Sequence, residues 1–338
     1  MERMWSRWFA VLSALVIAMP AAPRSRPRYG GTLRVEVRAD IETADPPASG
    51  RGLPDLAGEF TITRWEAGRR AVYSANEGAA GRPFLDSVEI QLARPFREQA
   101  IDLDLGRADV VEFGPNEMRR AAPGRKTWTS APVHVVALVF AARVTDARVR
   151  EALALSVDRS AIHNVLLQRQ GEISGALLPQ WLSGYAFLFS TAVDLPKARS
   201  LAAGLAPAAR VLSLGFDDAR LRPIADRVAL NARDAGLAVS VGTSNADVRL
   251  VEARIESADP ARALSGVAKA LSLGEPAHVD SPESLYAFER ALLDGYRAVP
   301  LFHLPDVYGV GARVKGPPGI TSLGEWRFGD LWLEGNRP

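Results

Sequence analysis

The stretch TDARVREALALSVDRSAIHNVLLQ, residues 145–168, offers two places where a helix can begin. Thr145 or Asp146 can cap a first helix, and Asp158 can cap a second one. Between and after these caps the apolar residues recur at helical spacing: Val149, Leu153 and Val157, then Ile162, Leu166 and Leu167. We therefore predict two consecutive amphipathic helices with a capped break between them. Such a pair is common in proteins, so it predicts architecture and no activity.

The composition is that of an ordinary globular protein. The chain has 338 residues, of which 47% are hydrophobic and 24% charged, and this length predicts one large domain or two moderate ones. The net charge is only +2, and the charges are mixed along the chain. Because the arginines form no basic block and aromatic residues do not alternate with them, we expect no nucleic-acid partner.

The N-terminal sequence MERMWSRWFAVLSALVIAMPAA has the pattern of a secretory signal peptide, which we place at residues 1–22. Two arginines precede an apolar run that is short for a membrane span, and small residues follow it. An uncleaved anchor helix is the alternative. Since the chain contains no cysteine, it has neither disulfides nor a lipoprotein cysteine. We predict a soluble, exported, periplasmic protein in which residues 23–29 form a linker.

Strand and helix patterns alternate along the rest of the chain. Residues 30–140 are rich in strand patterns, whereas 210–216, 221–232 and 237–241 read as strand, helix and strand. A strand, a crossover helix and a second strand favour a parallel pair, which belongs to an α/β domain. Further strands are expected at 247–253, 299–304 and 308–314, and a helix at 281–296.

The residues with reactive side chains show no catalytic arrangement. His134, His163, His278 and His303 are scattered without paired spacing, so we interpret each as a structural residue and predict neither a metal site nor a cofactor. Glu256 and Asp259 are the acidic pair we single out, because they follow a predicted strand where α/β domains present ligands. The alternative is a solvated loop in which Asp259 caps the next helix.

Several ordered segments resemble one known family. These are YGGTLRVEVRADIETADP, then GEFTITRWEAGRRAVYSANEGAAGRPFLDSVEIQLA, then TDARVREALALSVDRSAI, and finally AVPLFHLPDVYGVGARVKG. In this order they are similar to the family 5 extracellular solute-binding proteins of ABC transporters, whose members capture peptides, nickel complexes, oligosaccharides or opines. The resemblance extends over most of residues 29–328. It implies a solute-binding protein rather than an enzyme.

The resemblance implies a two-lobed α/β clamshell of the periplasmic-binding-protein type (type II, cluster C-like). We assign 30–140 plus 304–338 to lobe I and 141–303 to lobe II. Lobe I is reduced, because family members are longer and the segment ASGRGLPDLA stands where they have further strands and a subdomain. In such proteins the helical pair at 145–168 begins the second lobe, so Arg148 and Arg150 are expected to stabilise that lobe.

The implied function is capture of a peptide-like or other small polar solute by lobe closure, followed by delivery to an ABC permease of the inner membrane. The protein is expected to be a monomer without a cofactor. Glu256 stands where peptide-binding relatives carry an acid that pairs with the ligand's amino terminus, although Ala253 replaces their aromatic residue. The remaining candidate ligand-binding residues are Asp259 and four aromatic residues, for which core packing is the alternative: Trp65, Trp181, Tyr185 and Phe302. A shortened, non-binding relative with a structural or regulatory docking role is the alternative function.

Overall fold

The computed structural model describes residues 26–45, 56, 58–78, 81–185, 188, 190–242, 245–274 and 279–335. The predicted signal peptide at 1–22, the first part of the predicted linker and His278 lie outside the described residues. None of the helices in the described part of the chain combines the length and the hydropathy needed to cross a bilayer.

The elements follow the strand and helix patterns of the sequence. The strands are β1 (Thr32–Glu36), β2 (Phe60–Glu66), β3 (Arg70–Ala75), β4 (Ser87–Gln91), β5 (Val110–Glu112), β6 (Thr127–Phe140), β7 (Glu172–Ile173), β8 (Val211–Phe216), β9 (Ala238–Val241), β10 (Val248–Arg254), β11 (Ala298–Val310), β12 (Val314–Lys315) and β13 (Trp332–Leu333). The α-helices are α1 (Phe96–Asp104), α2 (Pro115–Arg120), α3 (Ala147–Ser156), α4 (Arg159–Val165), α5 (Gln180–Ser183), α6 (Leu195–Ala203), α7 (Arg222–Asp234), α8 (Pro260–Ala270) and α9 (Pro282–Leu293). Short 3-10 helices are η1 (Pro207–Arg210), η2 (Ala219–Leu221) and η3 (Asp294–Tyr296).

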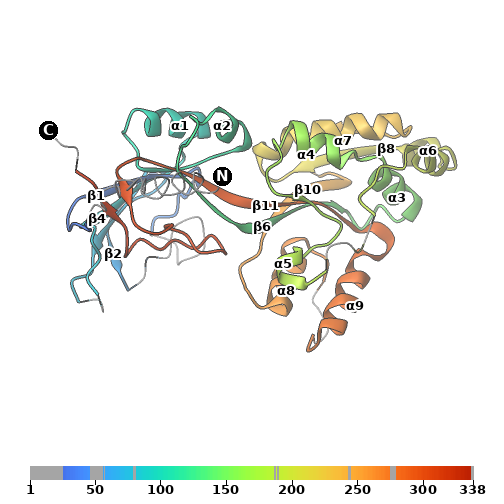
Figure 1. Ribbon diagram of the computed structural model, residues 1–338. Helices are drawn as coiled ribbons and strands as arrows, with labels where there is room; N and C mark the ends of the chain where they lie inside the picture. The colour runs from blue at the N-terminus through green and yellow to red at the C-terminus, as the bar shows by residue number, and fades with distance from the viewer. Residues whose placement is uncertain are drawn as a thin grey trace, which may run out of the picture.

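A continuous mixed sheet runs through both lobes of an α/β fold (Figure 1). Its strand order is β2-β3-β4-β1-β5-β11-β6-β10-β8-β9, with β7 added on β11. The first five strands build the first lobe, and β10, β8 and β9 lie in the second. The long antiparallel strands β6 and β11 cross from one lobe to the other. The two lobes are therefore joined through a pair of strands, which is the connection that lets lobes move as hinged bodies.

The two caps expected in 145–168 are present. The Asp146 side chain accepts a hydrogen bond from the backbone N–H of Arg148 at the start of α3, and Asp158 accepts one from Ala161 at the start of α4. Each cap satisfies one of the free N–H groups of a first helical turn. Arg150 then donates to the carbonyl of Gly295, which holds α3 against η3. The predicted parallel pair is also confirmed, since β8 and β9 run parallel on either side of α7.

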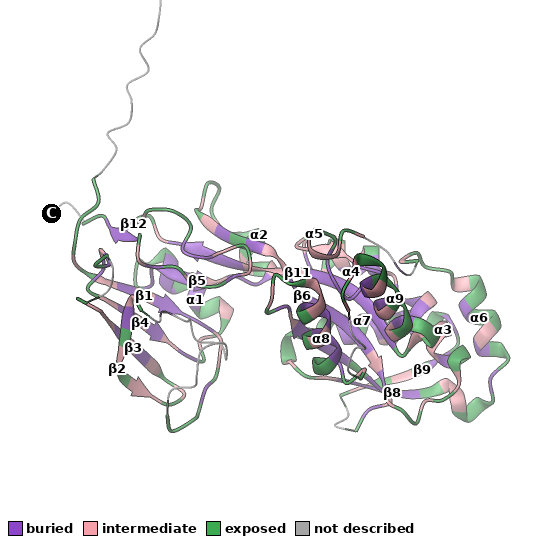
Figure 2. Cartoon of the chain, turned by 90° about the horizontal axis from the view of Figure 1, so that it is seen from below, coloured by how far each residue is buried: buried purple, intermediate pink, exposed green. Residues whose placement is uncertain are grey.

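The cores lie on both faces of the sheet (Figure 2). Leu138 of β6 and Leu250 of β10 face the layer of α3 and α7, whereas the neighbouring Ala137 and Val251 face the layer of α8 and α9. This alternation follows from the two-residue period of a strand. Each fully buried leucine contributes about 2 kcal/mol relative to an exposed one. The second lobe is therefore stabilised as three layers.

Strand β6 contributes to the cores of both lobes. Trp128 packs with the first-lobe cluster, which also contains Phe328 and Leu331 from the C-terminal segment. Leu138 packs in the second lobe. The contacts make β6 a strand shared by the two lobes, and the division after residue 140 stays a prediction.

Candidate functional site

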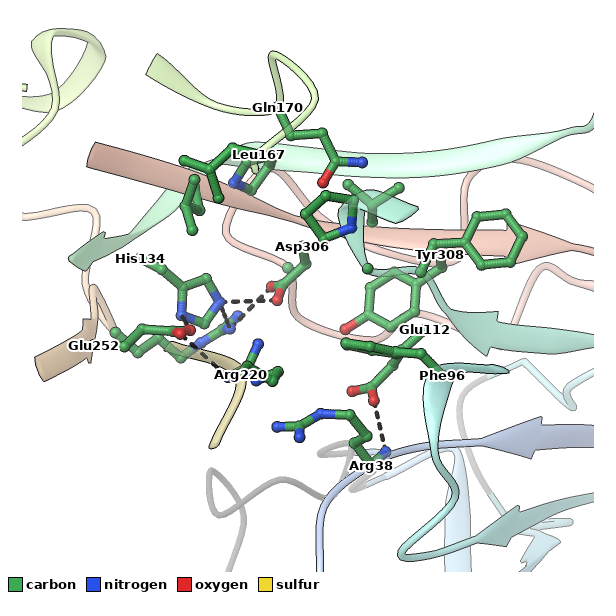
Figure 3. A pocket seen from close by; sticks show the side chains of 18 of the residues that line it. Arg38, Phe96, Glu112, His134, Leu167, Gln170, Arg220, Glu252, Asp306 and Tyr308 are labelled. Atoms are coloured by element: carbon green, nitrogen blue, oxygen red, sulfur yellow. Dashed lines mark hydrogen bonds and ion pairs between the residues drawn. The ribbon is translucent and has the colours of Figure 1, made fainter. Parts of the chain in front are cut away.

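A cleft of about 890 Å³ lies where the lobes meet (Figure 3). The first lobe contributes the segments around Arg38, Phe96 and 112–117. The second lobe contributes the end of α4 and the segment in which η2 leads into α7. Strands β6, β10 and β11 supply the floor. Ligand sites are most often concave and placed between domains, so this is the candidate site.

Along one face of the sheet the residues change from apolar, beneath the helices, to charged, at the floor of the cleft. Leu138 and Leu250 occupy this face beneath the helices. Nearer the first lobe the same face carries His134, four residues before Leu138 on β6, and Glu252, two residues after Leu250 on β10; the register places His134 opposite Arg254. Since neighbours across an antiparallel pair interact, the strand register itself brings these groups together.

His134 lies between two carboxylates. Its Nδ1 is 2.9 Å from Oε1 of Glu252, and its Nε2 is 2.9 Å from Oδ1 of Asp306. Both ring nitrogens must donate to satisfy this arrangement, which requires the imidazolium form. Burial alone would lower the pKa of His134, but hydrogen bonds to Asp306 and Glu252 outweigh it and raise that pKa to about 9. His134 is therefore a fixed positive charge at neutral pH.

Asp306 reaches His134 because β11 is irregular at this point. The pairing of β11 with β6 shifts register between Leu304 and Pro305, and again between Pro305 and Val307. Proline cannot donate to the ladder and is typical of such bulges, which re-aim neighbouring side chains. The Ser130 hydroxyl accepts from the backbone N–H of Asp306 at 2.9 Å and fixes the turned segment.

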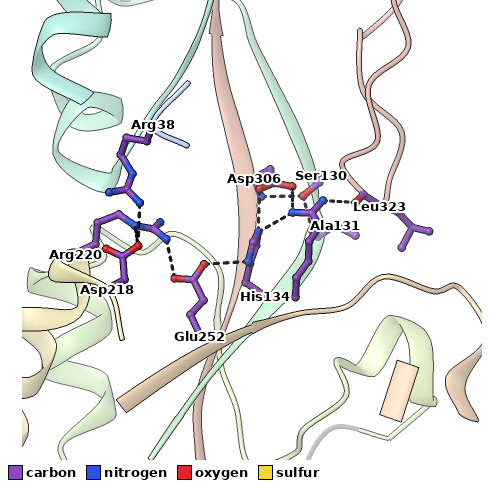
Figure 4. A network of polar contacts seen from close by, with 10 residues as sticks. Arg38, Ser130, Ala131, His134, Asp218, Arg220, Glu252, Asp306 and Leu323 are labelled. Atoms are coloured by element: carbon purple, nitrogen blue, oxygen red, sulfur yellow. Dashed lines mark hydrogen bonds and ion pairs between the residues drawn. The ribbon is translucent and has the colours of Figure 1, made fainter. Parts of the chain in front are cut away.

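Arginines extend the network on both sides (Figure 4). Arg254 donates from Nη1 to Oδ2 of Asp306 at 2.9 Å, and Arg220 lies with Nη2 3.2 Å from Oε2 of Glu252. Burial would raise the pKa of Glu252 and of Asp306, but the cations around them hold both below their ordinary values. The buried charges therefore neutralise one another, which is the condition for keeping them inside a protein.

Arg38 links this network to the first lobe. Its Nη2 lies 2.9 Å from Oδ2 of Asp218, the residue that caps η2 in the second lobe. The guanidinium stands over the ring of Phe96, 5.2 Å from its centroid. Arg38 and Phe96 belong to the first lobe, so this ion pair ties the lobes together across the cleft.

The sequence matches the profile of the bacterial extracellular solute-binding proteins, family 5 (middle), over residues 8–265. The chain belongs to this family. The family is one of transport binding proteins, not of enzymes. No curated protein matches the sequence.

Solved structures of family 5 type share the two-lobed fold. DppA from Helicobacter pylori in complex with the peptide STSA is 17% identical, with a TM-score of 0.68 and a match over 85% of this chain and 63% of that one. AgaA from A. tumefaciens R10 with agropinic acid is 19% identical, with a TM-score of 0.66 over 82% and 67%. NikA from Staphylococcus aureus with Ni(L-His)2 is 14% identical, with a TM-score of 0.68 over 85% and 71%. The chain spans about two thirds of the length of such structures.

The two acids singled out in the sequence differ in position. Glu256 is exposed, lines the cleft just after β10, and makes no hydrogen bond or ion pair with a described residue. Asp259 lies outside the cleft lining and caps α8, where it accepts from the backbone N–H of Arg262 at 2.8 Å. The Glu256 carboxylate therefore lies in the cleft without a described partner, whereas the Asp259 carboxylate is engaged in the helix cap.

The four aromatic candidates are not among the residues that line the cleft. Phe302 is 0% exposed within the second-lobe core, so it has no surface to offer a solute. Tyr185 donates its hydroxyl to Glu289, and Trp181 donates to the carbonyl of Pro132 at 3.0 Å. The indole N–H of Trp65 donates to the carbonyl of Thr43 at 3.0 Å. Other aromatic residues line the cleft instead: Phe96, Phe113, Tyr308 and Trp326.

Sequence reasoning missed the charged floor. His134 stands inside the otherwise apolar segment PVHVVALVF, and a charged group in such a segment must find a partner. The sequence shows that His134 needs a partner, but it does not show which residues are its partners. Within the described ranges no group of three or more acidic or histidine side chains is placed to hold a metal ion.

Proposed function

We propose that this chain captures a small solute, peptide-like or otherwise polar, between its lobes and delivers it to an ABC permease in the inner membrane. The observation that carries the proposal is the cleft of about 890 Å³ bounded by both lobes. Its volume falls within the range of small-molecule sites, roughly 300–1,000 Å³. The protein would act as an exported, periplasmic monomer.

Lobe closure provides the mechanism. The lobes are joined by β6 and β11, and a solute that contacts both lobes stabilises the arrangement in which they approach. The ion pair of Arg38 with Asp218 forms across the same gap, so closure and this contact support each other. A permease could then distinguish the loaded form by its shape.

The relatives support a solute of modest size. The solved structures carry a short peptide, an opine and a nickel–histidine complex, all smaller than a protein partner. For this chain we propose Glu256 as a contact for a positively charged group of the solute, because its carboxylate lines the cleft without a described partner.

Thermal unfolding against a panel of di- to pentapeptides, metal chelates and oligosaccharides tests the proposal. A ligand present at about 100 times its dissociation constant adds about 2.7 kcal/mol to the stability of the folded state, which gives a measurable rise in Tm. Glu256→Ala should reduce that rise. Glu283→Ala, which removes an exposed glutamate of the same lobe outside the cleft lining, should preserve it.

Two outcomes would count against the proposal. A folded protein whose Tm responds to no member of the panel would favour the shortened, non-binding relative with a docking role. A Tm rise that survives in Glu256→Ala would keep the binding function and remove Glu256 from the site.

A further inference from the structure

The cations that line the cleft are already paired with the protein's own carboxylates. Arg38, Arg220 and Arg254 each have a guanidinium nitrogen 2.9, 3.2 and 2.9 Å from a carboxylate oxygen. His134 contacts the carboxylates of Glu252 and Asp306, which also pair with Arg220 and Arg254. An anionic solute would have to compete with these carboxylates for the same cations and would bring a further negative charge among them, which is unfavourable.

The carboxylates of the cleft are in excess. Its lining holds six carboxylates against three arginines and one histidine. Glu112, at the end of β5, is half-buried, and its carboxylate accepts a hydrogen bond from the backbone N–H of Arg38 at 2.6 Å. No side-chain cation of the described residues forms an ion pair with it. Burial raises the pKa of Glu112 against the opposing influence of Arg38 and Arg220, as expected for a carboxyl group without a direct counter-ion.

Aromatic rings adjoin this carboxylate. Tyr308 of β11 pairs directly with Glu112 across the strands, and its ring packs against that of Trp326 with centroids 4.6 Å apart. Both rings line the cleft, and Figure 3 shows Glu112, Tyr308 and Phe96 beside one another. A carboxylate beside aromatic rings favours an organic cation, because the charge meets its counter-ion while the rings contact its apolar part and attract it electrostatically.

We infer that the solute is an organic cation, an ammonium or guanidinium group carried on an apolar body, and that Glu112 holds its charge from the first lobe. This inference rests on the proposed function and specifies its ligand class. Glu112 and Glu256 extend from different lobes, so a cationic solute between them would draw the lobes together. Neutral and anionic solutes lack this link.

Isothermal titration with matched probes tests the inference. Phenethylammonium, phenylacetamide and phenylacetate share an aromatic body and differ in charge, and benzylguanidinium with the neutral benzylurea repeats the comparison for guanidinium. We expect the cations to bind at least about tenfold more tightly than their neutral and anionic counterparts. Glu112→Gln keeps an acceptor for the Arg38 N–H and should weaken the cations by at least about tenfold. Glu98→Gln, which changes an exposed side chain of α1 outside the lining, should leave their affinity unchanged.

The outcomes separate this inference from the proposed function. Equal affinity for charged and neutral probes, tighter binding of the anions, or cation binding that is unchanged in Glu112→Gln would overturn the inference while solute binding stands. A folded protein that binds none of the probes, cationic or otherwise, and none of the solute panel would overturn both.

Discussion

Replacing His134 by glutamine tests the charged floor of the cleft most directly. The histidine joins Glu252 of β10 to Asp306 of β11, and only 17% of its side chain is exposed. Solvent therefore screens these ion pairs less than it screens pairs on the surface. Glutamine keeps hydrogen-bonding groups but cannot carry the positive charge.

The magnitude follows from the pKa of His134. It rises from an ordinary value of 6.5 to about 9 in the folded protein. Because each pKa unit corresponds to about 1.4 kcal/mol, protonated His134 contributes up to about 3 kcal/mol to folding. A raised pKa means that this contribution is complete below pH 6.5 and is lost as the pH rises through 9.

Urea unfolding followed by tryptophan fluorescence at pH 6, 7.5 and 9.5 measures this effect. The free-energy difference between wild type and His134→Gln should shrink by about 2–3 kcal/mol from pH 6 to 9.5. Besides Glu252 and Asp306, the charged groups near the His134 ring are Arg254, which contacts it, and Arg220, which contacts Glu252. The pKa values of Glu252 and Asp306 are lowered, so these carboxylates do not titrate between pH 6 and 9.5. Glu252→Gln should move the loss of stability to lower pH. Parallel pH curves for wild type and His134→Gln would refute the reasoning.

Two further substitutions probe the connection of the lobes and the backbone. Arg38→Gln removes the ion pair across the cleft and should lower the free energy of unfolding by about 1 kcal/mol or less. Small-angle scattering should show a larger radius of gyration for the unliganded variant than for the wild type. An unchanged radius would contradict the role of this contact. Gly171 has φ of +70°, and a Cβ there would overlap the carbonyl oxygen of His303. Gly171→Ala should therefore lower the free energy of unfolding by more than about 1 kcal/mol. The loss should exceed that of Gly184→Ala, because Gly184 has a φ of +81° but open surroundings. Equal losses in urea unfolding would show that the close approach of Gly171 to His303 is unimportant.

Local sequence was enough to predict the elements and their order. Asp146 and Asp158 cap their helices as expected, because capping depends on one side chain and the N–H groups of the next turn. Hydrophobic spacing predicted α7, whose Ile224 and Val228 are buried as a stripe. The resemblance to family 5 came from the order of such segments, and the family was confirmed over residues 8–265.

The cleft depended on contacts that no local pattern contains. The ion pair of His134 with Asp306 joins residues that are 172 positions apart, and its geometry depends on register shifts at Pro305. The aromatic candidates illustrate the same difficulty, since the spacing of Phe302 does not distinguish a core residue from one that lines a cleft. Sequence by itself thus determined the elements, their caps and the family, because these depend on near neighbours and segment order. Tertiary structure alone decided which charged groups meet, because pairing across strands depends on register, bulges and the approach of two lobes.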